Sequence, residues 1–209
     1  MNILSHRGYW KTQEERNTAV AFERSFRLGY GTETDVRDCA GTLVISHDMP
    51  TGSEMPFEEF LKLFCQYDNR LPLALNVKAD GIAVKMVELL RRHGVANWFT
   101  FDMSVPDYRS QLSLGVPAYG RLSEYEGWTP LTERSKGVWL DAFEHEWYRM
   151  SEISDWLARG KHVCIVSPEL HKRAHLKLWA ALKSTSLPQH PDLQLCTDLP
   201  EDAREFFFG

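Results

Sequence analysis

Short apolar runs alternate with segments of helical periodicity along the chain. Residues 17–29 have helical periodicity, because Ala21, Phe22 and Phe26 fall on one helical face and Gly29 is a typical residue at a helix C-terminus. The apolar runs predict eight main strands, near residues 2–6, 30–36, 72–78, 98–102, 116–121, 137–141, 162–167 and 193–198. The periodic segments predict helices at 17–29, 57–64, 81–94, 105–115, 146–160 and 169–184, with an irregular connection at 123–135.

Strands that alternate with helices favour a parallel sheet, and eight such units favour closure into a barrel. We therefore expect an α/β fold, a compact (β/α)8 TIM barrel, with one domain over residues 1–209. A further short strand within 42–47 should return along the second main strand after a tight reversal at Ala40-Gly41. An open doubly wound sheet is the alternative, but the first strand-to-helix turn lacks a G-x-G-x-x-G loop.

Composition and charge narrow the possible partners. A formal charge of −5 and a pI near 5.9 argue against general nucleic-acid or anionic-membrane binding, although a locally basic cleft stays open. No apolar run approaches the ~20 residues of a membrane span and the N-terminus has no signal peptide, so we expect a cytoplasmic protein without stable membrane insertion. Four widely spaced cysteines favour buried thiols over a disulfide framework or a zinc site.

Polar side chains gather where the predicted strands end, which in a barrel is where active sites form. This holds for the early strands and for the later ones. The polar residues at or next to strand ends are His6, Arg7, Glu33, Asp35, His47, Asn76, Lys78, Asp102, Arg121, Asp141, Thr197 and Asp198. Because strand side chains alternate between faces, Glu33 and Asp35 point the same way, as do Asn76 and Lys78.

Two carboxylates on one face repel each other unless a cation lies between them. A divalent cation, Mg²⁺ or Ca²⁺, suits such oxygen ligands. Arg7 or Lys78 could share that task, and a solvated acidic strand end without metal is the plain alternative. Arg7 and Lys78 also suit phosphate oxygens, while His6 and His47 can exchange protons near neutral pH.

The motifs "SHRG", "NTAVAF" and "GTETDVRDCAGTLVISHD", followed by "LNVK", "FTFD" and "CTDLP", resemble the glycerophosphodiester phosphodiesterase family over essentially the whole chain. The resemblance implies a (β/α)8 barrel that cleaves a small-molecule phosphodiester with the help of a divalent cation. By motif position, His6 and His47 are the acid–base pair, Arg7 and Lys78 bind the phosphate, and Glu33 and Asp35 bind the metal. It also implies that Asn17 braces the first loop.

Two features depart from the family pattern. Asn76 stands where the family has a third metal-ligating Glu, so it is a weaker ligand candidate, and the segment from His47 to Asn76 is short, which predicts a more open site. Glu124 or Glu126 could supply the missing carboxylate, although a solvated loop is the plainer interpretation. The remaining histidines need no functional role; they are His93, His145, His162, His171, His175 and His190.

Three functions therefore stay open. The first is metal-assisted phosphodiester hydrolysis, and the second is a sphingomyelinase D-like lyase reaction that gives a cyclic phosphate. The third, suggested by Asn76, is a barrel that binds a phosphorylated ligand with weakened or lost turnover. The alcohol groups of the substrate, the roles of the two histidines and the oligomeric state are not fixed by the sequence.

Overall fold

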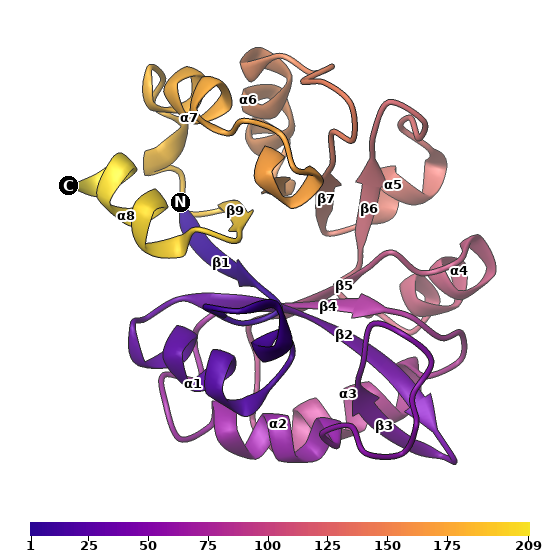
Figure 1. Cartoon of the computed structure of the whole chain (residues 1–209). Helices are drawn as coiled ribbons and strands as arrows, with labels where there is room; N and C mark the ends of the chain where they lie inside the picture. The colour runs from indigo at the N-terminus through magenta and orange to yellow at the C-terminus, as the bar shows by residue number, and fades with distance from the viewer.

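A computed structural model of residues 1–209 shows eight parallel strands arranged as a barrel and surrounded by helices (Figure 1). The strands are β1 (Asn2–His6), β2 (Gly31–Cys39), β3 (Thr42–Ile45), β4 (Leu73–Val77), β5 (Trp98–Phe101), β6 (Tyr119–Leu122), β7 (Gly137–Leu140), β8 (His162–Val166) and β9 (Leu193–Thr197). They follow the order β5-β4-β2-β1-β9-β8-β7-β6, and β3 pairs antiparallel with β2. The predicted barrel and the additional return strand are confirmed.

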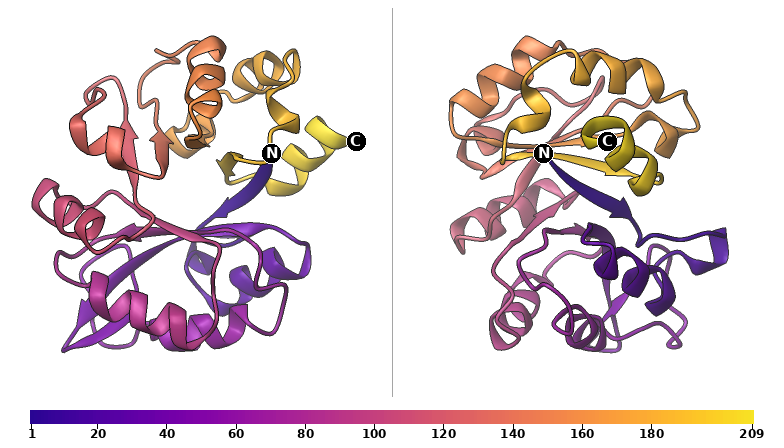
Figure 2. Two further views of the ribbon diagram at one scale, coloured as in Figure 1. Left: turned by 180° about the vertical axis from the view of Figure 1, so that it is seen from behind. Right: turned by 90° about the vertical axis from the view of Figure 1, so that its left-hand side faces the viewer.

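Helices cover the outside of this barrel, as the views from behind and from the side show (Figure 2). They are α1 (Ala19–Arg27), α2 (Phe57–Phe64), α3 (Ala83–Arg92), α4 (Val105–Ser113), α5 (Pro130–Arg134), α6 (Met150–Ala158), α7 (Leu176–Lys183) and α8 (Pro200–Phe208). Short 3₁₀ turns occur at Gln13–Glu15 (η1), Pro168–His171 (η2) and Leu187–Gln189 (η3). Most of these helices turn an apolar face inward; α1, for example, buries Ala21, Phe22 and Phe26.

Three expectations about helices need correction. The supposedly irregular segment 123–135 contains α5, which begins at Pro130 behind a Thr129 N-cap. The predicted helix 169–184 is divided into η2 and α7. The last strand is followed by α8, which the sequence patterns did not identify and which contacts β1.

The barrel closes least regularly between β5 and β6. Only one bridge, Thr100 with Ala118, joins these neighbours, together with a 3.2 Å hydrogen bond from Thr100 N to Pro117 O. Pro117 has no N–H to extend the ladder. Aromatic packing inside the barrel fills this side instead, because Phe99 stacks on Tyr119 with ring centroids 3.7 Å apart.

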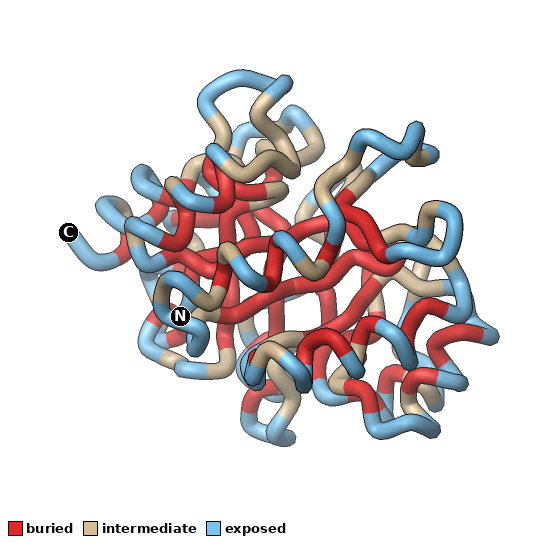
Figure 3. The backbone as a smooth tube through the Cα atoms, turned by 90° about the horizontal axis from the view of Figure 1, so that it is seen from below, coloured by how far each residue is buried: buried red, intermediate tan, exposed pale blue.

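The core has an inner and an outer part, and Figure 3 shows the buried strands within a shell whose outer turns are exposed. The inner cluster fills the barrel with nine side chains, among them Leu4, Phe101 and Trp139. Two larger clusters lie between the outer faces of the strands and the helices. The barrel interior is therefore a packed core, and in this fold active sites form at the carboxyl ends of the strands.

Every helix of the structure is too short or too polar to span a lipid bilayer. All four cysteines are free thiols; Cys164 and Cys196 are buried in the barrel, whereas Cys39 and Cys65 are half-buried.

Candidate active site

The strand register brings the polar strand ends together at one mouth of the barrel. His6 of β1 is aligned with Glu33 of β2, and Asp35 of β2 is aligned with Asn76 of β4. Inward-facing positions of a parallel sheet share this alignment, so the side chains project into the same space. The side-chain orientation that the sequence predicts for these strand residues is therefore the orientation seen in the structure.

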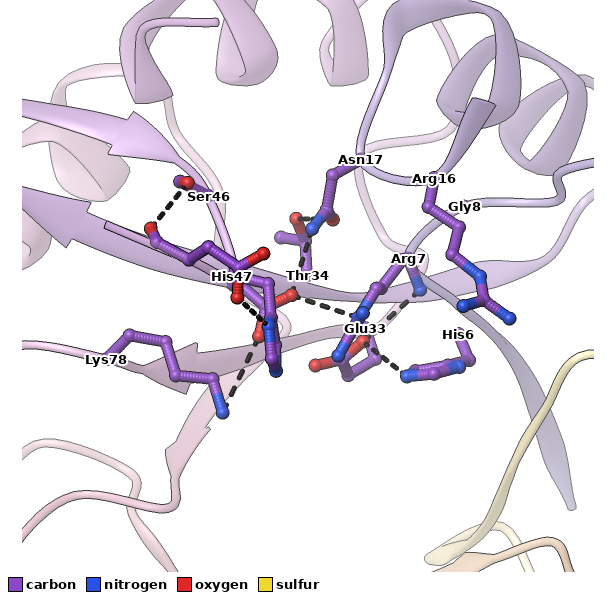
Figure 4. Close-up of polar contacts among 12 residues, drawn as sticks. His6, Arg7, Gly8, Arg16, Asn17, Glu33, Thr34, Ser46, His47 and Lys78 are labelled. Carbon is purple, nitrogen blue, oxygen red and sulfur yellow. Dashed lines mark hydrogen bonds and ion pairs between the residues drawn. The ribbon is translucent and has the colours of Figure 1, made fainter. Parts of the chain in front are cut away.

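A cavity of about 260 Å³ occupies this mouth. Six of its lining residues are those selected from the sequence: His6, Arg7, Glu33, His47, Asn76 and Lys78. Figure 4 shows the side chains of His6, Arg7, Glu33, His47 and Lys78 directed toward a common centre. Asp35, the seventh, is fully buried beside this centre. The structure thus brings all seven predicted residues together.

Asp35 is surrounded by cations and one amide. Its Oδ2 lies 3.1 Å from Arg7 Nε and accepts a 2.9 Å hydrogen bond from Asn17 Nδ2. Lys78 Nζ lies 3.7 Å from the other oxygen, Oδ1, and 3.2 Å from Asp102 Oδ2. Arg7 and Lys78 therefore offset the charge of Asp35 in the protein itself, one of the arrangements that the sequence left open.

Local backbone geometry fixes Arg7 over Asp35. Arg7 and Gly8 have φ values of 58° and 80°, and a Cβ on Gly8 would lie 2.7 Å from the Cβ of Ala21. Only glycine fits this turn, because it has both a left-handed φ and a close helix contact. Asn17 N donates a 2.9 Å hydrogen bond to Arg7 O, and Asn17 Oδ1 accepts one of 2.9 Å from Thr34. Asn17 braces the loop, as the resemblance implied.

Glu33 is 2% exposed, and its Oε2 accepts a 3.2 Å hydrogen bond from Arg7 N. Burial, followed by the nearby charge of Asp35, raises the pKa of Glu33 to about 7, although His6, Arg7 and Lys78 act in the opposite direction. Near neutral pH this carboxyl therefore holds a proton in a large fraction of molecules unless a further cation binds.

The two candidate acid–base histidines are held differently. His6 Nδ1 lies 2.8 Å from Asp198 Oδ1, which fixes the ring and leaves Nε2 4.0 Å from Glu33 Oε2. Glu169 in turn accepts a 3.2 Å hydrogen bond from Asp198 N. His47 is 44% exposed at the rim, and its Nδ1 lies 2.9 Å from the solvent-exposed Asp48. One imidazole is thus oriented from within the barrel, whereas the other is open to solvent.

The donor set at β2 and β4 fits a hard divalent cation, but with modest charge. Asp35 Oδ1 and Asn76 Oδ1 are buried and accept no hydrogen bond, which is the state expected of oxygens that ligate a metal. With Glu33 they form a set of three oxygen-bearing side chains on adjacent strands. Only two are carboxylates, and no group of three or more His, Cys, Asp or Glu side chains has the arrangement of a metal site.

The sequence interpretation missed several residues of the site. The strand-end pattern includes Asp102, Arg121 and Asp141 but gives them no role, and all three line the cavity. Arg121 is held by Asp102 and by Glu126, whereas Glu124 accepts backbone hydrogen bonds from residues 143–145. Both glutamates are thus engaged within the protein, Glu126 by Arg121 and Glu124 by backbone N–H groups, and neither has the solvated state of the plainer interpretation.

His171, for which the sequence indicates no functional role, also lines the cavity. Its Nε2 lies 2.6 Å from Asp141 Oδ1. It lies in η2, which is separated from α7 in place of the expected continuous helix. The other five histidines do not line this cavity.

The fold and the position of its polar residues define a (β/α)8 barrel with a candidate active site at the carboxyl ends of the strands. No protein-family model matches the sequence, and no curated protein matches it at a significant level. Solved structures of glycerophosphodiester phosphodiesterases have the same fold, which confirms the resemblance seen in the motifs at the level of fold.

Three of these structures cover nearly all of the chain. A provisionally named glycerophosphodiester phosphodiesterase from Galdieria sulphuraria gives a TM-score of 0.76 at 16% identity, over 100% of this chain and 98% of that one. The glycerophosphodiester phosphodiesterase of Agrobacterium tumefaciens gives 0.72 at 16% identity, over 98% and 99%. A phosphodiesterase from Oleispira antarctica, in complex with the product sn-glycerol-3-phosphate, gives 0.71 at 17% identity, over 100% and 97%.

Proposed function

We propose that the chain is a phosphodiester hydrolase acting on small glycerophosphodiester-like substrates. The observation that carries the proposal is the convergence of two imidazoles, a guanidinium and an ammonium on one cavity, provided by His6, His47, Arg7 and Lys78. A tetrahedral phosphate with two anionic or partly anionic oxygens matches this combination of donors. The shared fold with phosphodiesterases supports the same conclusion.

In this proposal Arg7 and Lys78 bind the non-bridging oxygens and stabilise the charge that they gain in the transition state. One imidazole takes a proton from water as its oxygen attacks phosphorus. The other, as imidazolium, gives a proton to the alcohol oxygen as the P–O bond breaks, so that an alcohol and a phosphate monoester leave. The assignment of the two roles to His6 and His47 is left open.

Glu33, Asp35 and Asn76 are the residues that would hold a divalent cation, Mg²⁺ or Ca²⁺. When bound, such a cation neutralises negative charge on the phosphoryl oxygens. Because Asn76 contributes no charge, we expect weaker metal binding than three carboxylates give. Arg7 and Lys78, already in contact with Asp35, supply positive charge at the same place.

The proposed substrate is a small-molecule diester rather than a nucleic acid or a membrane lipid surface. The chain is proposed to act as a single domain in the cytoplasm. Two other functions give distinct outcomes in the same assay. An attack by a hydroxyl of the substrate itself, as in a sphingomyelinase D-like lyase, would give a cyclic phosphate that persists. A barrel that only binds its ligand, as Asn76 suggests, would show binding without turnover.

The test compares the wild type with His6→Ala and His47→Ala on a panel of glycerophosphodiesters, with Mg²⁺, with Ca²⁺ and with chelator, followed by ³¹P NMR. We expect kcat/KM to fall at least about a hundredfold in each variant, because an acid–base group contributes roughly that much or more. His93→Ala is the matched control, since His93 lies at the end of α3 beside Glu58 and outside the cavity. Unchanged turnover in both histidine variants would eliminate the proposal.

A further inference from the structure

Two cavities meet at the barrel mouth, and they share only Arg7 and His47. The inner cavity of about 260 Å³ lies over the barrel, and an outer cleft of about 670 Å³ lies between the loop after β1 and the loop after β3. A phosphodiester also has two arms that meet at one phosphorus. A phosphate held at the junction by Arg7 therefore gives each alcohol its own compartment.

The inner cavity has an apolar floor and polar walls, and the wall opposite the phosphate-binding residues in the sequence order of the strands comes from the segments after β7 and β8. Phe101 and Trp139 form the floor, stacked with centroids 3.8 Å apart. Asp141 and His171 belong to the wall, far along the sequence from the phosphate-binding residues. Asp141 is 6% exposed, and its Oδ1 lies 2.6 Å from His171 Nε2 and accepts a 2.9 Å hydrogen bond from Ala142 N.

The position of His171 is fixed from several sides. Its ring packs edge-on against Phe143 with centroids 4.9 Å apart. Lys172, with φ of 59°, ends the η2 turn directly after it. Arg173 Nη1 donates a 2.8 Å hydrogen bond to Ala142 O and so ties this loop to the segment after β7. His171 is therefore a preorganised group and not a free surface side chain.

The remaining hydrogen-bonding capacity of this wall suits a hydroxyl group. Because Nε2 of His171 lies against the carboxylate of Asp141, Nδ1 is the ring nitrogen left for a ligand, and it makes no hydrogen bond within the chain. Arg121, which faces the same cavity, is already held by Asp102 and Glu126. A second anionic group would meet the carboxylate of Asp141, whereas a hydroxyl can donate to His171 without a charge conflict.

We propose that the inner cavity binds a hydroxyl-bearing alcohol arm of the substrate, and that His171, oriented by Asp141, determines the preference for that arm. This inference rests on the proposed function, because it assumes a phosphoester at the junction of the two cavities. His171 contacts the alcohol here and takes no part in the proton transfers assigned to His6 and His47.

Calorimetry with two phosphate monoesters tests the inference without requiring turnover. Glycerol 3-phosphate and n-propyl phosphate have the same carbon chain but differ in two hydroxyls. We expect the wild type to bind glycerol 3-phosphate about tenfold more tightly, the value of one well-placed hydrogen bond. His171→Leu should bring the two affinities to within about threefold, mainly by weakening glycerol 3-phosphate. His171→Gln, whose side-chain oxygen can accept from a hydroxyl, should restore part of the preference.

His145→Leu is the matched control, since His145 is also a histidine near a carboxylate, 4.0 Å from Glu124, but is exposed and outside the cavity. This variant should keep the wild-type preference. Equal affinities in the wild type, or an unchanged preference in His171→Leu, would overturn the inference while leaving diester cleavage, and hence the proposed function, intact. Failure of the wild type to bind either ester or to cleave any diester would overturn both.

Discussion

Glu33 and Asp35, the two inward-facing carboxyl groups of β2, lie close together because their surroundings stabilise them in different ways. Asp35 lies within reach of Arg7 and Lys78 and receives a hydrogen bond from Asn17. Glu33 is equally buried but lies farther from compensating charge, and its pKa is raised to about 7 by burial and by Asp35. Burial and the charge of Asp35 thus favour the protonated form of Glu33, whereas neighbouring cations offset the charge of Asp35.

This difference predicts a pH-dependent stability in the presence of chelator. In the unfolded chain Glu33 loses its proton near the ordinary glutamate pKa of 4.5, whereas in the folded chain it keeps it until about 7. Stability from this group is therefore fully present below about pH 4.5 and is lost as pH rises to about 7. The free energy of unfolding should fall over that window by an amount on the order of 3 kcal/mol.

Urea unfolding of the wild type and Glu33→Gln across pH 4 to 8 measures this contribution, because glutamine does not titrate and all other groups are common to both. The difference between the two profiles should decline between about pH 4.5 and 7 and level off above it. Parallel profiles would show that Glu33 titrates normally in the folded chain.

Neighbouring strands β2 and β4 supply the candidate metal ligands as a unit. Their register aligns Asp35 with Asn76, and both residues have a buried oxygen without a hydrogen-bond partner. The low negative charge of these candidate ligands, and not their geometry, should then limit the affinity for a metal. A third carboxylate at position 76 should complete the ligand set for a hard cation.

Asn76→Glu is therefore expected to tighten Mg²⁺ or Ca²⁺ binding about tenfold or more, measured by calorimetry and by the rise in Tm that saturating metal produces. Asn76→Gln is the control, because it lengthens the side chain by the same amount without adding charge. If both variants bind metal as the wild type does, residue 76 does not face the ion.

The predicted and observed elements differ in the connections between strands more than in the strands themselves. Strand ends carried a clear polar signal, so His6, Glu33 and Asn76 could be placed on one face from alternation alone. No comparable signal marked Lys172, whose left-handed backbone separates η2 from α7. The apolar spacing of residues 169–184 favours a continuous helix, and only tertiary contacts such as that of Arg173 with Ala142 make the division visible.

The barrel as an entire architecture follows from the count and alternation of strands, because eight βα units have few other ways to bury both faces of a parallel sheet. The pairing of side chains at the ends of neighbouring strands does not follow from that count. Arg121 reaches Asp102, and His6 reaches Asp198, through distances set by barrel closure. Alternation tells which residues face inward, but not which of them touch.

The central claim is that residues at the barrel mouth activate a water molecule, whose oxygen attacks the phosphorus of the diester. Turnover of a glycerophosphodiester in H₂¹⁸O, with mass analysis of both products, tests it most directly. We predict that the wild type places ¹⁸O in the phosphate monoester and none in the released alcohol, and that His6→Ala loses this incorporation. Label in the alcohol, or wild-type incorporation by His6→Ala, would contradict the account.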